Sequence, residues 1–379
     1  MFSYYDSLFR SPADIAGRIS TNKKYLRKSL KYKADEGFAD ILSKLKIKLF
    51  ISREYEHLLL CLSSEKGKIK QTYHPLPHPS GLAVKEGFLY AASTRNPNYI
   101  VQFGSVKDFL TRKEDKIIHK PGALVPLRTK FYPGAYYFHD LAFIGNDLYA
   151  NSVGQNGVVK IDFDKAAPDP VLWRPPLKGQ AAEKLLKSNY LQLNSIAAGQ
   201  DLQNSFFSAS TETPGKLRPG NPDFPVDGRG VIFSGSGDIV ARGLTRPHSA
   251  RLHRGKLWIN NSGYGSFGFI ENQKFVPLIK LPGWTRGLFL KDNIAFVGTS
   301  RILERFENYA PGLRKSEAFT AVYAIDIEKK EIAGKIKFPY GNQIFGIEAM
   351  DDELSNGFIF NNIQNNTMRI KSYFYKYKI

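Results

Sequence analysis

Two of the seven histidines, His139 and His248, stand at the same position in two copies of a repeated sequence phrase. A third, His78, comes two residues before another copy. Residues at equivalent positions of structural repeats occupy equivalent places in a fold, so we expect these imidazoles to converge. Because imidazole titrates near neutral pH and also binds transition metals, the pattern predicts a functional site lined by histidine.

One interpretation of this site is proton transfer next to a carboxylate. In it, Arg286 binds the carboxylate of a substrate through two parallel hydrogen bonds. The proton is moved by His139, His248 or Tyr137. Four more side chains, each near the start or the end of a strand in the repeat pattern, are predicted to join Arg286 in substrate binding: Arg95, Asn194, Glu212 and Arg301.

Two other interpretations stay open. The site could hold one divalent metal ion, for which the candidate ligands are His78, His139, His248 and Gln343. The sequence contains no HExxH or CxxC element that would support such a site. Alternatively, the polar side chains only fill the narrow end of a channel and hydrogen-bond one another there. The expected cofactor is therefore either none or one divalent metal ion.

The repeated phrase starts with a variable residue, continues with a small or acidic one and ends in a mostly apolar run. Its copies span residues 80–84, 139–143, 194–198, 248–252, 286–290 and 345–349. A second β-rich run follows four of them, at residues 88–92, 147–151, 256–260 and 293–297. Self-similar units of roughly 40–60 residues with several strands each are typical of a β-propeller. The first residues of the copies should then face the central channel: Ser80, His139, Asn194, His248, Arg286 and Phe345.

The predicted fold is therefore all-β, a propeller with six blades favoured. Residues 46–51, 57–62 and 68–73 resemble three strands without a phrase ahead of them, and the copy at 345–350 would complete their blade from the other end of the chain. Strand-like runs at 357–362 and 368–375 leave seven blades open. We predict two regions, a short, helical basic extension at residues 1–40 and the propeller at residues 41–379.

The chain of 379 residues carries a net charge of +19, which favours an anionic partner, and an acidic glycan is the one we expect. Six lysines and arginines between residues 21 and 33 are also consistent with an amphipathic helix on an anionic membrane surface. The alternative is a helix packed on the propeller with its lysines in water. Nucleic acid is not favoured, because the basic residues are dispersed and no nucleic-acid-reading motif is visible.

The location expected from the sequence is cytoplasmic, with membrane association through residues 21–33 as an addition. No apolar run approaches the roughly 18 residues of a membrane span, and the first residues lack the pattern of a signal peptide. The single cysteine, Cys61, stands in an apolar run and is expected to be buried.

Segments at residues 138–143, 246–258 and 281–288 resemble an uncharacterised bacterial family of propeller-like conserved hypothetical proteins, some of them attached to tetratricopeptide repeats. The resemblance covers about residues 45–355 and implies the propeller fold, without an activity. A looser likeness is to propeller enzymes that cleave acidic sugars by β-elimination and hold a metal with histidines and a glutamine. In this sequence the matching residue types are His78, His139, His248 and Gln343.

We therefore expect an enzyme that acts on an acidic carbohydrate by proton abstraction next to a carboxylate. Its reaction would be of the lyase or epimerase type, in bacterial surface-polysaccharide biosynthesis. The alternative from another class is a non-catalytic propeller, either a scaffold or a glycan-binding module in a polysaccharide-assembly complex.

Overall fold

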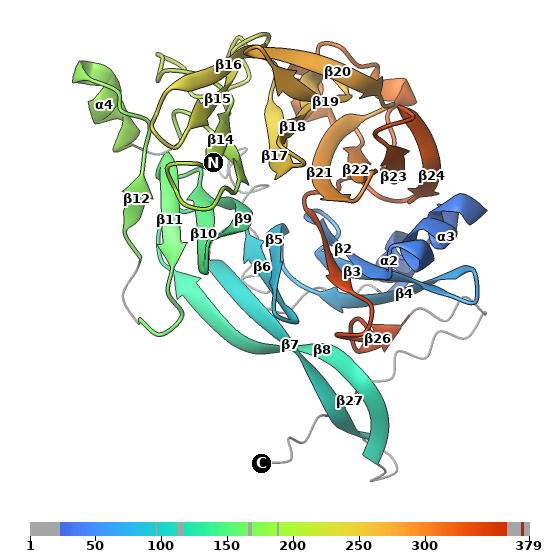
Figure 1. The fold of residues 1–379 in the computed structure, drawn as a ribbon. Helices are drawn as coiled ribbons and strands as arrows, with labels where there is room; N and C mark the ends of the chain where they lie inside the picture. Colours follow the sequence, from blue (N-terminus) through green and yellow to red (C-terminus); the bar gives the residue numbers. More distant parts are fainter. Residues whose placement is uncertain are drawn as a thin grey trace.

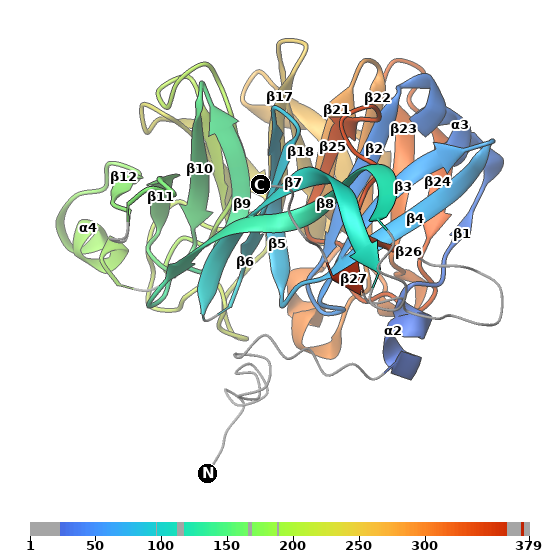
Figure 2. The same cartoon turned by 90° about the horizontal axis from the view of Figure 1, so that it is seen from below.

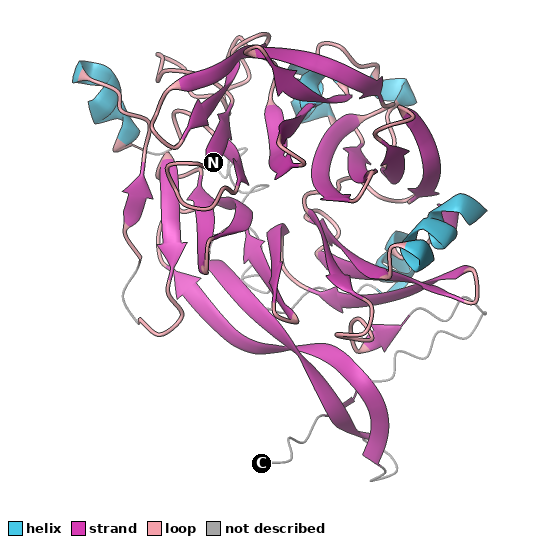
Figure 3. Ribbon diagram, viewed as in Figure 1, coloured by secondary structure: helices cyan, strands magenta, loops and turns pink. Residues whose placement is uncertain are grey.

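The six copies of the repeated phrase form the innermost strands of six antiparallel sheets. These strands are β5 (Pro79–Lys85), β9 (Phe138–Ile144), β13 (Leu193–Ala197), β17 (Pro247–His253), β21 (Trp284–Lys291) and β25 (Ile347–Asp351). The computed structural model describes residues 23–95, 97–111, 117–165, 169–187, 189–361 and 373–374. In it each inner strand contacts the next one in a closed ring, and the sheets stand around that ring as blades (Figures 1 and 3). The predicted six-bladed propeller is confirmed.

Each blade continues outward from its inner strand through three further antiparallel strands. Blade 1 adds β6 (Phe88–Ser93), β7 (Asn98–Thr111) and β8 (Ile117–Tyr132), and blade 2 adds β10 (Asp147–Ser152), β11 (Gly157–Ile161) and β12 (Val171–Trp173). Blade 3 adds β14 (Phe206–Ala209), β15 (Gly230–Ser234) and β16 (Ile239–Leu244). Blade 4 adds β18 (Lys256–Asn261), β19 (Ser266–Glu271) and β20 (Lys274–Lys280), and blade 5 adds β22 (Ile294–Ser300), β23 (Ala321–Asp326) and β24 (Glu331–Lys337).

Blade 6 closes the ring with strands from both ends of the described chain. Its inner strand β25 pairs with β2 (Ile47–Arg53), which is followed by β3 (Leu58–Glu65) and β4 (Lys68–Pro75). The short strands β26 (Phe360–Asn361) and β27 (Tyr373–Phe374) pair with β4 and β7, so within the described residues they extend existing blades and form no seventh one. β7 and β8 run past the rest of blade 1 as a long hairpin (Figure 2).

The apolar core lies between neighbouring blades. Every residue of β2, β22 and β23 is buried, because a sheet between two other sheets has no face in water. At the contact of blades 2 and 3, the rings of Trp173 and Phe207 lie 4.1 Å apart. Burial on both faces accounts for the near-continuous apolar runs that mark these strands in the sequence.

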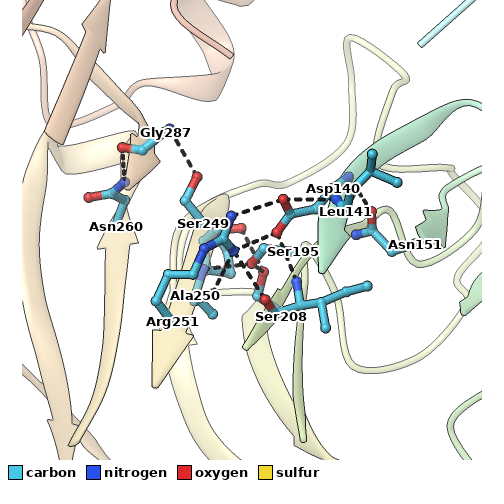
Figure 4. A network of polar contacts seen from close by, with 12 residues as sticks. Asp140, Leu141, Asn151, Ser195, Ser208, Ser249, Ala250, Arg251, Asn260 and Gly287 are labelled. Carbon is cyan, nitrogen blue, oxygen red and sulfur yellow. Dashed lines mark hydrogen bonds and ion pairs between the residues drawn. The ribbon is translucent and has the colours of Figure 1, made fainter. Parts of the chain in front are cut away.

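The second residue of the repeated phrase joins one blade to the next at the centre of the ring (Figure 4). Asp140 accepts a hydrogen bond from the backbone N–H of Ile196 in blade 3 (3.0 Å), and Ser195 accepts one from the N–H of Ala250 in blade 4 (2.8 Å). Ser249 in turn accepts one from the N–H of Gly287 in blade 5 (2.9 Å). The small or acidic residue type is therefore required because its short side chain bonds the backbone of the adjacent inner strand.

The phrase carries glycine at this position in the three other blades. At Gly81 an added Cβ would lie 2.5 Å from the Cα of Asp140, so blade 1 contacts blade 2 through its backbone. Between blades 6 and 1, Ser52 of β2 takes the linking role: its Oγ accepts from the N–H of Gly346 (2.7 Å) and donates to the carbonyl of Ser80.

The helical segments lie outside the six sheets. They are α2 (Lys23–Ser29), α3 (Glu36–Lys44), α4 (Gly179–Leu185) and the 3-10 turns η1 (Ser262–Tyr264), η2 (Glu304–Tyr309) and η3 (Lys315–Glu317). β1 (Lys33–Ala34) pairs with β24, and α3 buries Phe38 and Leu42 against β24 and β3. Asp35 caps α3 by accepting from the N–H of Phe38 (3.1 Å). The boundary predicted at residue 40 stays a prediction.

The basic segment predicted at residues 21–33 is helical only in part. Leu30 is buried, while Arg27, Lys28 and Lys31 are exposed, and the ammonium groups of both lysines lie 5.8 Å from the ring of Tyr340. Residues 21 and 22 lie outside the described residues. Across the described helices, none has the length and apolar character needed to cross a membrane. Binding to an anionic membrane surface stays a prediction.

Candidate functional site

A pocket of about 590 Å³ opens on the face of the propeller where the inner strands begin and the second strands end. Antiparallel pairing within each blade brings these two kinds of strand end together. His139, His248, Arg286 and Phe345 line the pocket, as predicted from the start of the phrase. The ring of His139 lies 5.3 Å from that of Phe345, so residues more than 200 positions apart in the chain meet across the axis.

Arg286 lies at the floor of the pocket and is 5% exposed. Its guanidinium stacks on the ring of Phe345, with the central carbon 3.3 Å from the ring centroid. Gln343, with its amide turned so that both ends have partners, accepts from Nη1 of Arg286 (2.9 Å) and donates to Oε2 of Glu54 (2.7 Å). Burial lowers the pKa of Arg286 to about 9. The negative charge of Glu54 acts in the opposite direction but does not outweigh burial.

Glu54 is a buried carboxylate that the sequence analysis did not single out. Thr94 donates to its Oε1 (2.6 Å), and Nε of Arg95 and Nδ1 of His78 each lie 3.7 Å from the same oxygen. Burial acts to raise the pKa of Glu54, but the neighbouring imidazole of His78 and the charges of Arg95 and Arg286 outweigh it and hold this pKa well below its usual value. Glu54 is therefore an anion under all ordinary conditions.

The pocket has an excess of positive charge. Among the described residues that line it, the charged side chains are Glu54, Arg95 and Arg286. One carboxylate thus faces two guanidinium groups, and one of those is buried. Because an unbalanced charge is costly where burial separates it from solvent, as at Arg286, the pocket favours a ligand that brings a negative charge.

His139 lies against Arg286, with its Nδ1 3.5 Å from Nη2 of the guanidinium. Burial and then the charge of Arg286 lower the pKa of His139 well below its usual value, while Glu54 and a hydrogen bond with Asn194 act in the opposite direction. The imidazole is neutral at neutral pH.

His248 is 2% exposed and packs edge to face with Trp284, with 5.5 Å between the two ring centroids. Its Nδ1 lies 2.8 Å from the backbone oxygen of Arg246 and 3.4 Å from Oγ of Ser262. Burial and then the charge of Arg286 lower the pKa of His248 well below its usual value. This imidazole, too, is neutral at neutral pH.

The four residues predicted as metal ligands occupy different surroundings. His78 packs on His57 (4.2 Å between ring centroids) and lies beside Glu54, behind the residues that line the pocket. Gln343 joins Glu54 to Arg286 through its amide. In the part of the chain that the structure describes, no three His, Cys, Asp or Glu side chains gather closely enough to hold a metal ion. The metal interpretation stays a prediction.

The remaining predicted residues divide between the pocket and the surface. Tyr137 and Arg95 line the pocket, and Asn194 lies just below it, where its amide donates to Oγ of Ser210 (3.0 Å). Glu212 instead pairs with Arg242 on the surface (2.9 Å), and Arg301 lines a separate hollow near Asn342. The structure therefore brings Tyr137 and Arg95, but neither Glu212 nor Arg301, to the pocket.

Aromatic side chains form one wall of the pocket. Trp284 begins β21, and Phe306 and Tyr309 come from the long segment between β22 and β23, residues 301–320. Arg246 holds this segment in place, because its guanidinium stacks on Tyr309 at 3.8 Å and donates to the carbonyl of Pro219 in the segment between β14 and β15, residues 210–229. The Nε1–H of Trp284 is buried and has no hydrogen-bond partner among the described residues. The wall thus offers apolar ring faces for stacking.

The missed residue Glu54 follows a rule that the sequence already contained. Arg95, Glu212 and Arg301 were selected because each follows the second strand of a repeat, and Glu54 stands directly after β2, the second strand of blade 6. The signal was hidden because the inner strand of that blade comes from the other end of the chain.

Fold and pocket together define a six-bladed β-propeller with a polar, positively charged site at one mouth of its ring. The chain belongs to the family described as "Domain of unknown function (DUF4915)", whose model matches residues 36–356. This confirms the resemblance to an uncharacterised propeller-like family; an attachment to tetratricopeptide repeats stays a prediction. No curated protein matches the chain.

Solved structures resemble the chain in fold. A chain in the crystal structure of a nidogen/laminin complex matches with a TM-score of 0.54 at 9% identity, over 81% of this chain and 99% of that one. A putative 6-phosphogluconolactonase from Bacteroides uniformis matches with a TM-score of 0.46 at 13% identity, over 80% of this chain and 99% of that one. At such identities the likeness concerns the fold alone.

Proposed function

We propose that the mouth pocket binds an acidic carbohydrate, with the sugar's carboxylate on Arg286, and that the protein abstracts the proton next to that carboxylate. The observation that carries the proposal is the charge of the pocket, in which Arg95 and the buried Arg286 face the single carboxylate of Glu54. A bound carboxylate would balance the remaining charge and could accept two parallel hydrogen bonds from a guanidinium.

The aromatic wall supports a sugar as the rest of the ligand. A pyranose presents C–H groups on its faces and hydroxyl groups at its edge, and the rings of Trp284, Phe306 and Tyr309 line the pocket. The pocket volume of about 590 Å³ also lies within the roughly 300–1,000 Å³ of small-molecule sites. Such a ligand fits a role in bacterial surface-polysaccharide biosynthesis, as a lyase or an epimerase.

A second candidate is a non-catalytic module that binds the same class of glycan. It is favoured by one observation: in the free protein burial and the charge of Arg286 lower the pKa of both His139 and His248, which weakens them as bases. A bound carboxylate would offset the charge of Arg286 and thereby restore part of their basicity. The two candidates therefore differ in whether the bound sugar reacts.

Calorimetry with glucuronate- and galacturonate-containing oligosaccharides, beside neutral oligosaccharides of the same length, tests the binding. We expect the acidic sugars alone to bind. An Arg286→Lys change keeps the charge but loses the two-pronged contact, so the Kd should rise about 10- to 100-fold. The matched control is Arg254→Lys, at an exposed arginine that pairs with Glu328 (3.0 Å) in the neighbouring blade. Equal affinity for neutral sugars, or an unchanged Kd in Arg286→Lys, would contradict the proposal.

A further inference from the structure

The two pocket histidines contact groups of opposite hydrogen-bonding character. At His248 the near partner of Nδ1 is the backbone oxygen of Arg246, at 2.8 Å. A carbonyl oxygen can only accept, so Nδ1 of His248 carries the proton and donates it. In a neutral imidazole the other nitrogen then holds a lone pair. The Nε2 atom of His248 is therefore free to accept a proton.

At His139 the near partner of Nδ1 is the guanidinium of Arg286, at 3.5 Å from Nη2. A guanidinium can only donate, so Nδ1 of His139 is the accepting nitrogen and its proton sits on Nε2. The lone pair of His139 is thus directed at Arg286, which also stacks on Phe345 and bonds Gln343. His139 completes the set of contacts that fixes the position of this guanidinium.

From these two contacts we infer that His248 is the catalytic base of the pocket, accepting the substrate proton on Nε2, and that His139 is a positioning residue for Arg286. The inference rests on the proposed function, which it deepens by dividing the roles. Both groups lie close to Trp284: the ring of His248 is 5.5 Å from the indole ring, and the guanidinium of Arg286 is 5.9 Å from it. The base and the group that anchors the carboxylate thus line the same pocket on the same indole ring.

The reaction step is balanced without any further reagent. The C–H bond next to the substrate carboxylate breaks, the proton passes to Nε2 of His248, and the electron pair moves onto the carboxylate oxygens held by Arg286. The imidazolium that forms still donates from Nδ1 to the carbonyl of Arg246, which stabilises it. Return of the proton from Nε2 to the carbon regenerates the acid. In the alternative outcome, the electron pair moves back from the carboxylate to form a C=C bond, the C–O bond on the next carbon breaks with its pair on oxygen, and that oxygen takes the proton from Nε2, which gives an unsaturated acid and an alcohol.

Exchange of the substrate's C–H for deuterium in heavy water, followed by NMR, isolates the proposed base. The probe is the glucuronate or galacturonate oligosaccharide that binds in calorimetry. We expect His248→Gln to slow exchange by on the order of 100-fold or more while the Kd changes only a few-fold. His139→Leu should raise the Kd about 10-fold, and His139→Gln, whose amide oxygen can still accept from Arg286, should restore most of the affinity. His253→Gln, on a half-buried histidine at the far end of the same strand, is the control.

Nitrogen-15 NMR of the wild-type imidazoles tests the tautomers directly and needs no variant to fold. We expect the proton on Nδ1 in His248 and on Nε2 in His139. The same tautomer in both rings, or exchange that survives His248→Gln but is lost in His139→Gln, would overturn the division of roles. If the wild-type protein binds an acidic sugar without hydrogen exchange, the assignment of His248 as a catalytic base is wrong, and the binding proposal stands. If no acidic sugar binds, both the assignment and the binding proposal are wrong.

Discussion

Replacing Glu54 by glutamine tests whether the buried negative charge in the pocket stabilises the folded protein. The change keeps the size of the side chain but removes the negative charge that faces Arg95 and Arg286. It also replaces one of the two acceptor oxygens, which bond Thr94 and Gln343 in the wild-type protein. Removing one partner of a buried charged network costs about 3–5 kcal/mol, and we expect a loss of unfolding free energy in that range at neutral pH.

The dependence of this loss on pH follows from the depressed pKa of Glu54. A carboxylate whose folded pKa lies below its unfolded pKa contributes stability above the unfolded value, near 4.3, and loses it as the pH falls through the folded value. The gap between the wild-type protein and Glu54→Gln should therefore be largest near neutral pH and should narrow below about pH 4.

Urea unfolding at several pH values measures this gap. Glu212→Gln is the control, because Glu212 pairs with Arg242 on the surface, where an ion pair contributes about 1 kcal/mol or less. Equal stability losses in the two variants, or a loss in Glu54→Gln that does not vary with pH, would show that the pocket does not depend on a buried anion.

Two further predictions concern the centre of the ring. Gly81→Ala should lower the unfolding free energy by about 1–3 kcal/mol in denaturant titrations, because the new Cβ would lie 2.5 Å from the backbone of Asp140, whereas Gly215→Ala, with no atom closer than 3.8 Å, should change it little. Burial raises the pKa of Glu348 to about 7, so the native protein keeps a proton that the unfolded chain has lost, and stability falls as the pH rises from about 4.5 to 7. Glu348→Gln should therefore gain about 2–3 kcal/mol relative to the wild-type protein between about pH 4 and pH 8, and a difference that is constant with pH would contradict this.

The blades could be predicted from the sequence because their inner strands carry a phrase that recurs along the chain. The small or acidic second residue of each phrase recurs for a physical reason, seen at Asp140, Ser195 and Ser249, where it bonds the next inner strand. The closure of blade 6 could be predicted as well, since three strands without a phrase require an inner strand from elsewhere.

The site was predicted less completely, because a repeat gives the position of a residue in its blade but not its contacts. Arg95 and Arg301 both follow second strands, yet Arg95 turns to Glu54, while Arg301 bonds the carbonyl of Pro339 (3.3 Å). Gln343 was proposed as a metal ligand on its residue type, whereas its amide joins Glu54 to Arg286. Such contacts depend on loops after the strands, where the periodic pattern ends.

The way in which blade 6 is closed also constrains the order of folding and unfolding. Ser52 and Gly346, which bond each other in it, are 294 residues apart in the chain. A contact of such long range is costly in chain entropy and forms late, so β2 keeps an unpaired inner edge until β25 has been synthesised. Other chains can pair with an open strand edge, which exposes a growing polypeptide to aggregation. Tension on the folded chain would reach the pairing of β2 with β25 only after the outer pairs of β1 with β24 and of β26 with β4 had opened. Loss of the β2–β25 pair would then open the ring at the pocket, where Glu54 and Gln343 flank that pair.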